Sequence, residues 1–353
     1  MNTPILFTTQ SNTADLAWNE LRAALPGTRL ERWLTPGVGL ARVEGTWRTL
    51  ADTLISHPPI FIRHLCPAPL HIPLELAPDD LEILDHYARD LLLELDTTRP
   101  FSVQTRTLGE GRWPYTRFDI NNRLAATLAE WGAPLNVQHP EQILSVTLTP
   151  TEAFLGLSLT HENLSDWAGG ERRFKREEGQ ISRAEFKLLE ALEVFGLELP
   201  TEGLALDMGA APGGWTRILA GRGLRVIAVD PAELDPRVLA PMYPSALPSV
   251  THIRTIVENY LSAREPFDLI LNDMRMDARD SARVMLMAEK FLKPKGFAVM
   301  TLKLPERGMG EVARAALRIL GSGYSILGAR QLFHNRDEVT VALASLAEMK
   351  KAA

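Results

Sequence analysis

A glycine-rich turn that follows a short apolar segment constrains the fold of this chain more than any other feature. Residues 204–206 are apolar and lead into Asp207, and three glycines lie between that residue and Trp215. Glycine lets a backbone approach a ligand closely, and doubly wound sheets bind ligands at the carboxyl ends of their strands. The turn therefore predicts a ligand site where a first buried strand passes into a first helix.

The rest of the C-terminal half alternates between short apolar runs and helical segments. We expect helices at residues 215–220 and 282–292, and strands at 204–206, 226–229, 267–271, 297–302, 324–329 and 339–344. Three of these strands lead into Asp230, Asn272-Asp273 and Lys303. Continuous apolar strands that alternate with helices are typical of a parallel sheet with both faces covered. This half is therefore predicted to be α/β and doubly wound.

The N-terminal half has a different pattern, in which strands and helices are less regularly ordered. We expect helices at residues 14–25, 81–91 and 116–131, and strands at 5–8, 39–43, 60–65, 101–106, 143–148 and 153–159. Prolines are dense between residues 58 and 78, which predicts a linker or an irregular edge. A charged stretch at 171–180 separates this α+β region from the C-terminal half.

Length and composition indicate a globular protein with more than one domain. A chain of 353 residues is expected to form roughly two or three domains, and it is 45% hydrophobic and 23% charged. No run approaches the ~20 apolar residues of a membrane helix, and residues 1–10 lack a secretory pattern. Cys66 is the single cysteine, and His139, His161 and His334 lack metal-ligand spacing. We expect a cytoplasmic protein that requires no metal.

The glycine-rich turn favours S-adenosylmethionine over ATP or a dinucleotide. No Gly-Lys-Ser/Thr follows to hold phosphates, and Pro212 gives the turn a stiffness that the dinucleotide motif does not need. Asp230 ends the next strand about twenty residues later, where a carboxylate is placed to bind ribose hydroxyls. The alternatives are an ordinary nucleotide-binding turn or a turn with a structural role alone.

Four ionisable residues are expected at the same edge of the predicted sheet. Asp273 and Lys303 each follow a strand, Lys187 lies in a helix before the first strand, and Glu338 precedes the last strand. A ribose hydroxyl is a poor nucleophile, so a nearby base or cation helps its attack on a methyl donor. A lysine serves as this base if burial and a second lysine lower its pKa from about 10.4. Taken alone, each residue has a simpler alternative, because lysine and glutamate side chains near strand ends are usually solvated.

Taken together, these segments resemble the FtsJ-type RNA 2′-O-ribose methyltransferases. The resemblance rests on residues 182–190, 207–215, 272–274, 302–305 and 335–341. It implies a class I, Rossmann-like domain with a catalytic Lys-Asp-Lys-Glu set at Lys187, Asp273, Lys303 and Glu338, in which Lys303 is the general base. The implied cofactor-binding residues are Asp207, Gly209, Ala210, Ala211, Pro212, Gly213, Gly214, Trp215, Asp230, Glu258 and Asp273. Glu258 is a candidate for the adenine contact, in a region (255–260) where the family pattern has an uncertain register.

The upstream region resembles a THUMP domain preceded by a ferredoxin-like domain. We therefore expect a ferredoxin-like domain at residues 1–75, a THUMP-like RNA-binding domain at 76–165 and the methyltransferase domain at 175–353. Residues 331–338 are similar to bacterial enzymes that methylate a cytidine of 23S rRNA, so this RNA is the expected substrate of a monomeric enzyme. The alternatives are methylation of tRNA or another RNA, and a non-catalytic RNA-binding or assembly factor that retains the fold.

Binding of RNA requires local positive charge, because the net charge of the whole chain is −6. One candidate cluster precedes Lys187 and consists of Arg172, Arg173, Lys175, Arg176 and Arg183; a solvated linker is its alternative. A second candidate surface in the THUMP-like region consists of Arg106, Arg112, Arg117 and Arg123. Trp113 and Tyr115 are candidates for stacking on unpaired bases, or for packing in a core.

Overall fold

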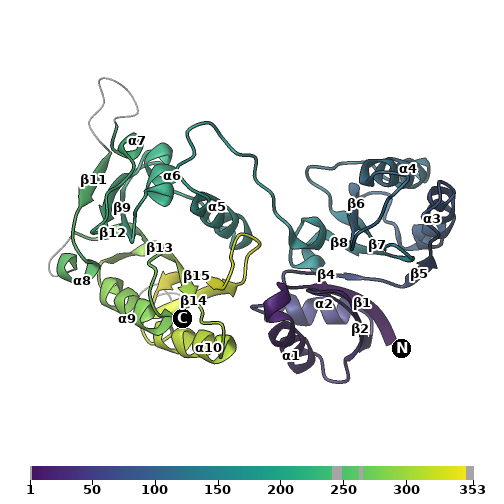
Figure 1. Cartoon of the computed structure of the whole chain (residues 1–353), viewed down its shortest axis with the longest axis horizontal. Coiled ribbons are helices and arrows are strands. Elements are labelled where there is room, and N and C mark those ends of the chain that lie inside the picture. The colour runs from purple at the N-terminus through teal and green to yellow at the C-terminus, as the bar shows by residue number, and fades with distance from the viewer. Residues whose placement is uncertain (1, 241–248, 262–264, 347–353) are drawn as a thin grey trace. The chain divides into compact units, whose positions relative to one another are not determined.

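The structure is a computed structural model that describes residues 2–240, 249–261 and 265–346. The chain forms two compact units, Met1–Glu171 and Arg172–Ala353, which are coloured purple to teal and teal to yellow in Figure 1. No helix within the described ranges has the length and apolarity to cross a bilayer.

The first sheet of the N-terminal unit has the strand order β2-β3-β1-β4, and all neighbours are antiparallel. Its strands are β1 (Asn2–Thr8), β2 (Arg29–Thr35), β3 (Val38–Glu44) and β4 (His64–Pro67), and helices α1 (Ala14–Ala24) and α2 (Trp47–Ser56) connect them. A βαββαβ order with this sheet is the ferredoxin-like arrangement. The expected ferredoxin-like fold is therefore confirmed.

The second sheet has the order β5-β8-β7-β6, in which β6 and β7 are parallel and the other neighbours antiparallel. It contains β5 (Leu70–Pro73), β6 (Phe101–Thr107), β7 (Gln142–Thr149) and β8 (Glu152–Leu159), with helices α3 (Asp80–Ala88) and α4 (Arg117–Glu130). Phe101, Leu124 and Leu144 lie in the core that the sheet and helices share.

The proline-dense segment is more ordered than the sequence predicts. It contains β4, which begins at His64 rather than at residue 60, and β5, which pairs with β8 in the second sheet. Both are edge strands, where proline is tolerated because no neighbour needs its missing N–H. The second sheet thus begins at Leu70, before the expected domain boundary at residue 75.

The C-terminal unit is built on a seven-stranded sheet with the order β11-β10-β9-β12-β13-β15-β14. The strands are β9 (Leu204–Met208), β10 (Arg225–Val229), β11 (Val250–Ile253), β12 (Phe267–Asn272), β13 (Leu292–Lys303), β14 (Tyr324–Arg330) and β15 (Glu338–Ser345). Strands β9 to β13 are mutually parallel, whereas β15 is antiparallel to β13 and β14. The predicted doubly wound, Rossmann-like α/β fold is confirmed.

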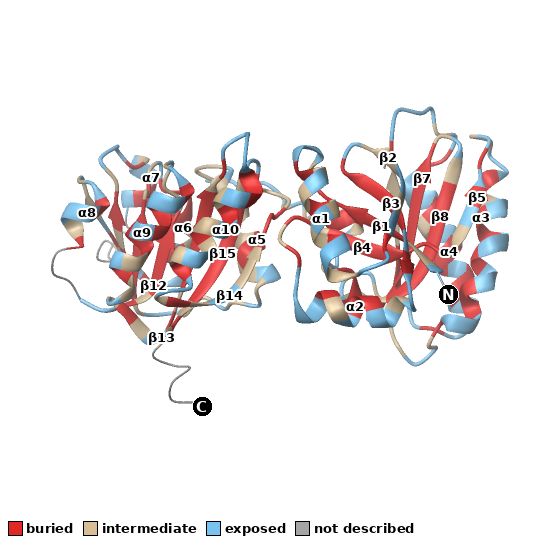
Figure 2. Ribbon diagram, turned by 90° about the horizontal axis from the view of Figure 1, so that it is seen from below, coloured by how far each residue is buried: buried red, intermediate tan, exposed pale blue. Residues whose placement is uncertain are grey.

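Helices cover both faces of this sheet (Figure 1). The helices are α5 (Ala184–Val194), α6 (Gly214–Arg222), α9 (Ala278–Glu289), α10 (Met309–Leu320) and the short α7 (Pro236–Leu239) and α8 (Val257–Tyr260). Leu269 and Leu271 share a core with α5 and α6, while the alternate residue Ile270 is buried on the other face, where α9 packs. Figure 2 shows that the central strands such as β12 and β13 are largely buried, whereas the edge strands β11 and β14 are more exposed.

Candidate active site

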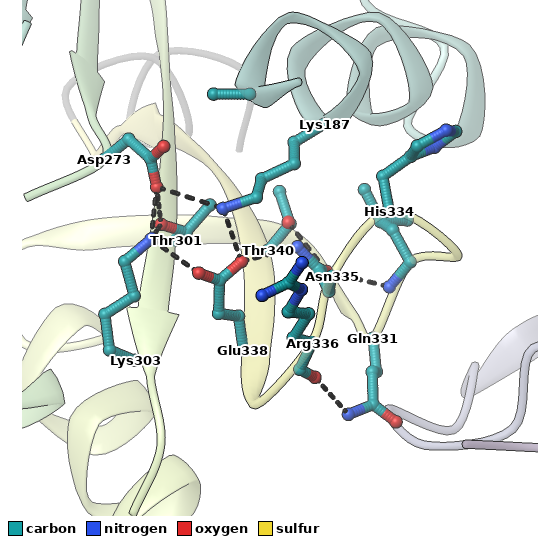
Figure 3. A network of polar contacts seen from close by, with 12 residues as sticks. Lys187, Asp273, Thr301, Lys303, Gln331, His334, Asn335, Arg336, Glu338 and Thr340 are labelled. Carbon is teal, nitrogen blue, oxygen red and sulfur yellow. Dashed lines mark hydrogen bonds and ion pairs between the residues drawn. The ribbon is translucent and has the colours of Figure 1, made fainter. Parts of the chain in front are cut away.

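The fold brings together the four ionisable residues expected at the sheet edge, which we call the charged tetrad (Figure 3). Lys187 extends from α5, Asp273 follows β12, Lys303 ends β13 and Glu338 begins β15. Lys303 and Glu338 are direct partners in the antiparallel register of β13 and β15. The end of one strand therefore meets the beginning of the other at the carboxyl edge of the parallel sheet.

The tetrad alternates positive and negative charges. Nζ of Lys303 donates a hydrogen bond to Asp273 and another, of 2.8 Å, to Oε1 of Glu338. Nζ of Lys187 lies 2.6 Å from Oε2 of Glu338 and 3.7 Å from Oδ1 of Asp273. The four side chains are 14–20% exposed, so the charges are largely removed from water and each stabilises its neighbours.

The pKa of Lys303 is opposite in direction to the sequence-based expectation. Burial lowers the pKa of this lysine, but the carboxylates of Asp273 and Glu338 outweigh burial and raise it overall. The expectation was wrong because carboxylates, rather than Lys187, are the direct neighbours of the Lys303 ammonium group. Lys303 therefore carries a proton at neutral pH in the protein alone.

Two polar residues that the sequence analysis did not single out complete the network. The hydroxyl of Thr301 donates to Asp273 and accepts a 2.7 Å hydrogen bond from Lys303. Asn335 donates to Oε2 of Glu338 over 3.4 Å. Thr301 precedes Lys303 by two positions on a strand, so the alternation of side chains along β13 was a signal that both face the same way.

Glu190, on α5, holds the loop before β15 through hydrogen bonds. Its buried carboxylate accepts hydrogen bonds from the backbone N–H groups of Phe333 (2.7 Å) and His334 (2.9 Å), and contacts Nδ1 of His334 at 2.7 Å. Lys187 lies one helical turn before Glu190, and Glu338 follows the loop. The Glu190 carboxylate therefore fixes the helix that carries one tetrad lysine to the loop that leads to a tetrad carboxylate.

A cavity of about 430 Å³ lies beside the tetrad, over the glycine-rich turn. Five of the predicted cofactor-binding residues line it: Gly209, Ala211, Asp230, Glu258 and Asp273. The alignment of residues 255–260 with the family pattern was uncertain. The structure places Glu258 at the cavity, because this residue lies in the short helix α8. Ile256, Val257, Met274 and Met276 add apolar surface.

The lining of this cavity fits S-adenosylmethionine. Asp230 accepts hydrogen bonds from the backbone N–H groups of Ala211 (3.0 Å) and Ala232 (2.8 Å), and each of its oxygens retains a lone pair for a ribose hydroxyl. A Cβ atom on Gly209 would lie 2.6 Å from the side chain of Met274, so a glycine is required for the turn to pass this close. In the described part of the chain, no group of three or more His, Cys, Asp or Glu side chains is arranged to hold a metal ion.

The other predicted cofactor-binding residues are not among those that line the cavity. Asp207 is buried and accepts a 2.6 Å hydrogen bond from Thr216, and burial raises its pKa to about 7. The indole of Trp215 donates to the carbonyl of Ala184 over 2.7 Å and packs in the core. Ala210, Pro212, Gly213 and Gly214 form the backbone of the turn, and Gly213 has a φ of +109°.

A second cavity, of about 550 Å³, also lies beside the tetrad. Its lining includes Lys303, Leu304 and Glu338, and it shares Asp273 and Arg275 with the first cavity. The two cavities therefore adjoin at Asp273 and Arg275, and Lys303 lines only the second one. This arrangement leaves room for two ligands next to one charged cluster.

The candidate RNA-binding residues fall into two kinds, those whose side chains are exposed and those that contact another side chain. Lys175, Arg176 and Arg183 are exposed, whereas Arg172 pairs with Glu193 (2.7 and 2.8 Å). In the N-terminal unit, Arg106 pairs with Glu171 at 2.7 Å. Arg173 lies over the ring of Phe333, Arg123 lies 3.7 Å from Asp85, and Arg112 and Arg117 are exposed.

Packing in a core is the alternative that the structure shows for Tyr115. Tyr115 is 7% exposed and donates its hydroxyl to Asp80 over 2.8 Å. Trp113 is partly buried and packs against the same core. The buried ring of Tyr115 has no free face for a base, so it does not supply an aromatic platform for RNA.

Several known proteins are similar to this chain. The proteins named ribosomal RNA large subunit methyltransferase M from Methylococcus capsulatus and Azotobacter vinelandii are 37% and 32% identical over 206 and 248 residues. The alignments cover 55% and 65% of this chain, which spans about 55–65% of the length of these curated relatives. The solved structure of TrmN from Thermus thermophilus matches with a TM-score of 0.41 at 19% identity, over 97% of this chain and 100% of that chain.

A family model described as FtsJ-like methyltransferase matches residues 180–303. This segment contains the glycine-rich turn, Asp230, Glu258 and three of the four tetrad residues. Glu338 follows it on β15. The resemblance that the sequence motifs indicated is therefore confirmed to this extent: the C-terminal unit contains a segment that matches FtsJ-like methyltransferases.

Proposed function

We propose that this chain transfers a methyl group from S-adenosylmethionine to the 2′-hydroxyl of an RNA ribose. The convergence of Lys187, Asp273, Lys303 and Glu338 beside two adjoining cavities carries the proposal, because a cofactor and a nucleotide could then both reach one charged cluster. The match to FtsJ-like methyltransferases supports the same reaction.

The first cavity would hold the cofactor, which supplies a methyl group on a positively charged sulfur. Asp230 and Glu258 would bind its hydroxyl and amino groups, and Gly209 would let the backbone approach it. Asp273 lines both cavities, so a methyl donor in the first cavity would adjoin the nucleotide in the second. Placement of two reactants in line removes much of the entropic barrier to their reaction.

Lys303 acts on the nucleotide side. It takes the proton of the ribose hydroxyl as this oxygen accepts the methyl group, and Glu338 and Asp273 stabilise the ammonium that results. Because these carboxylates raise the pKa of Lys303, only a minor fraction of the lysine is neutral at pH 7. The rate of methyl transfer is therefore expected to increase with pH until this lysine is deprotonated.

Large-subunit rRNA is the proposed substrate, and a cytidine the proposed target. The names of the similar proteins support this RNA, and the resemblance of residues 331–338 supports the nucleotide. We also propose that the N-terminal unit divides into a ferredoxin-like part and a THUMP-like part that binds RNA. The proposed setting is that of a cytoplasmic monomer, which gel filtration with light scattering tests directly.

Methyl transfer from labelled S-adenosylmethionine to separate rRNA and tRNA fractions tests the proposal. We expect label in large-subunit rRNA at an alkali-resistant linkage, because methylation of the 2′-oxygen prevents cleavage of the next phosphodiester. Label in tRNA alone would change the proposed substrate to tRNA and leave the proposed reaction unchanged. Cofactor binding without transfer to any RNA, or to ribosomal particles, would contradict the proposed activity and favour a non-catalytic factor.

A further inference from the structure

Two arginines line the second cavity with guanidinium groups that have no partner among the described residues. Arg275 follows β12 and Arg336 lies in the loop before β15, and both line this cavity together with Lys303 and Glu338. Both side chains are exposed, and within the described residues neither guanidinium makes an ion pair or a hydrogen bond. The backbone of Arg336 is held, because its carbonyl accepts a 3.2 Å hydrogen bond from Gln331.

A polyanion such as RNA binds at this cavity only if residues outside the tetrad add positive charge to it. The tetrad contributes two positive and two negative charges, which cancel. The whole chain has a net charge of −6. Of the tetrad, Asp273, Lys303 and Glu338 line this cavity, and the other charged residues of its lining are Arg275, Arg336 and Asp337. The two guanidinium groups therefore offset a lining that would otherwise be negative.

We propose that Arg275 and Arg336 bind the phosphate groups that flank the target ribose. This inference rests on the proposed function, since it assigns the second cavity to a nucleotide of RNA. A guanidinium group forms paired hydrogen bonds with phosphate oxygens, and its planar fork loses less entropy for each hydrogen bond formed than a lysine ammonium does. The two phosphate contacts would hold the ribose between them against Lys303.

Arg336 has the more specific position of the two. It lies two residues before Glu338, and Figure 3 shows its side chain on the tetrad side of the loop that also carries Asn335. Arg336 lines the second cavity alone, whereas Arg275 lines both cavities. Arg336 is therefore assigned to RNA by its position, and the assignment of Arg275 requires a measurement that separates RNA from cofactor.

Steady-state methyl transfer to deproteinised large-subunit rRNA, by the full chain at several salt concentrations, tests the inference. The variants are Arg336→Ala, Arg336→Lys and Arg275→Ala, and the matched control is Arg225→Ala, an exposed arginine at the opposite edge of the sheet. We expect each alanine variant at the cavity to lower kcat/KM for rRNA about ten- to a hundredfold, with an unchanged KM for S-adenosylmethionine. The logarithmic salt dependence should flatten by about 0.7 for each lost phosphate contact in single-stranded RNA.

Arg336→Lys should recover part of the loss, because lysine keeps the charge but not the paired geometry. Wild-type values of kcat/KM and salt dependence in Arg336→Ala would overturn the inference. An increased KM for S-adenosylmethionine in Arg275→Ala, with unchanged KM for rRNA, would reassign Arg275 to the cofactor and overturn the inference for this residue.

If the wild-type chain methylates no RNA, the proposed function fails separately. Filter binding of the same rRNA then decides the inference, and equal affinities of wild type and Arg336→Ala would overturn it.

Discussion

The two ends of strands β12 and β13 carry the same pair of residue types but differ in what surrounds them. At the amino end, Asp268 pairs with Lys293 at 2.8 Å, and at the carboxyl end Asp273 pairs with Lys303. The Lys293 side chain is 41% exposed and that of Lys303 is 20% exposed. A cavity of about 690 Å³ lies at the amino end, which is larger than either cavity beside the tetrad.

The difference lies in the number of partners rather than in the size of the cavity. Lys293 has one carboxylate partner on the surface, an arrangement that contributes about 0–1 kcal/mol of stability. Lys303 has three acceptors, and Lys187 joins them from a separate helix. Convergence of partly buried charges from several elements, and not volume, therefore distinguishes the candidate active site.

The largest expected effect is a difference in the rate of methyl transfer between variants of Lys303 and Lys293. We expect Lys303→Ala to lower the rate of methyl transfer by a factor of about 10²–10⁴, because it removes the proposed base. Lys293→Ala should leave the rate unchanged and alter the free energy of unfolding by at most about 1 kcal/mol. Single-turnover transfer to rRNA, with thermal unfolding as a control for folding, measures both. A similar loss of activity in the two variants would show that the carboxyl ends of β12 and β13 are no more important for the reaction than their amino ends.

A second comparison concerns two glutamates near opposite edges of the sheet. Glu190→Gln keeps the size of the side chain but removes the charge that binds Phe333 and His334, so the loop before Glu338 loosens. We expect about a tenfold lower kcat, an unchanged KM for S-adenosylmethionine and a free energy of unfolding reduced by about 1–3 kcal/mol. Glu198→Gln, at the amino-end cavity, should change none of these. A wild-type kcat in Glu190→Gln would show that the loop needs no such anchor.

A third comparison uses two glycines that both have positive φ. Gly209 (φ +74°) lies at the cofactor cavity, whereas Gly203 (φ +128°) precedes β9 at the other edge, and a Cβ atom on either would lie 2.6 Å from a neighbouring side chain. Alanine at either position should lower the free energy of unfolding by about 1–3 kcal/mol. Only Gly209→Ala should also weaken the binding of S-adenosylmethionine, measured by calorimetry. Equal cofactor affinities in both variants would place the cofactor elsewhere.

The smallest expected effect is a difference in pH dependence between two aspartates. Burial raises the pKa of Asp207 to about 7. The native state therefore holds a proton that the unfolded chain releases near pH ~4, and the free energy of unfolding falls as pH rises through this range. Burial also raises the pKa of Asp268, but Lys293 and the backbone N–H of Leu204 outweigh it and lower the pKa overall. The stability from Asp268 is therefore present above the unfolded pKa and lost as pH falls through the folded pKa.

Urea unfolding of Asp207→Asn and Asp268→Asn between about pH 4 and pH 8 measures this difference. Asp207→Asn should remove the decline of stability with rising pH, whereas Asp268→Asn should change the profile only in acid. If Asp207→Asn keeps the wild-type decline, the buried carboxyl group is not its source.

Much of the C-terminal unit was predictable from sequence because its strands are buried on both faces. Continuous apolar runs such as 267–271 identify such strands, and the residues that follow them, Asp273 and Lys303, meet at one edge by the geometry of a parallel sheet. The joint position of the tetrad could therefore be predicted before any distance was known.

Features that depend on tertiary neighbours were not predictable in this way. The proline-dense segment forms edge strands because their partners lie far along the chain, as in the pairing of β5 with β8. The direction of the Lys303 pKa depends on which charges lie nearest, and the burial of Tyr115 depends on its hydrogen bond with Asp80. Arg336 lies in a motif of the family resemblance, but its position at a cavity arises from the loop before β15 and could not be predicted from that motif.

Nucleoside analysis by mass spectrometry tests the central claim most directly. Large-subunit rRNA from cells that lack this protein would be incubated with the full chain and S-adenosylmethionine, digested to nucleosides and compared with a Lys303→Ala reaction. The account predicts newly formed 2′-O-methylcytidine with the wild-type chain and its absence with the variant. A base-methylated nucleoside, or equal amounts of product from both proteins, would contradict the assignment of the charged tetrad to ribose methylation.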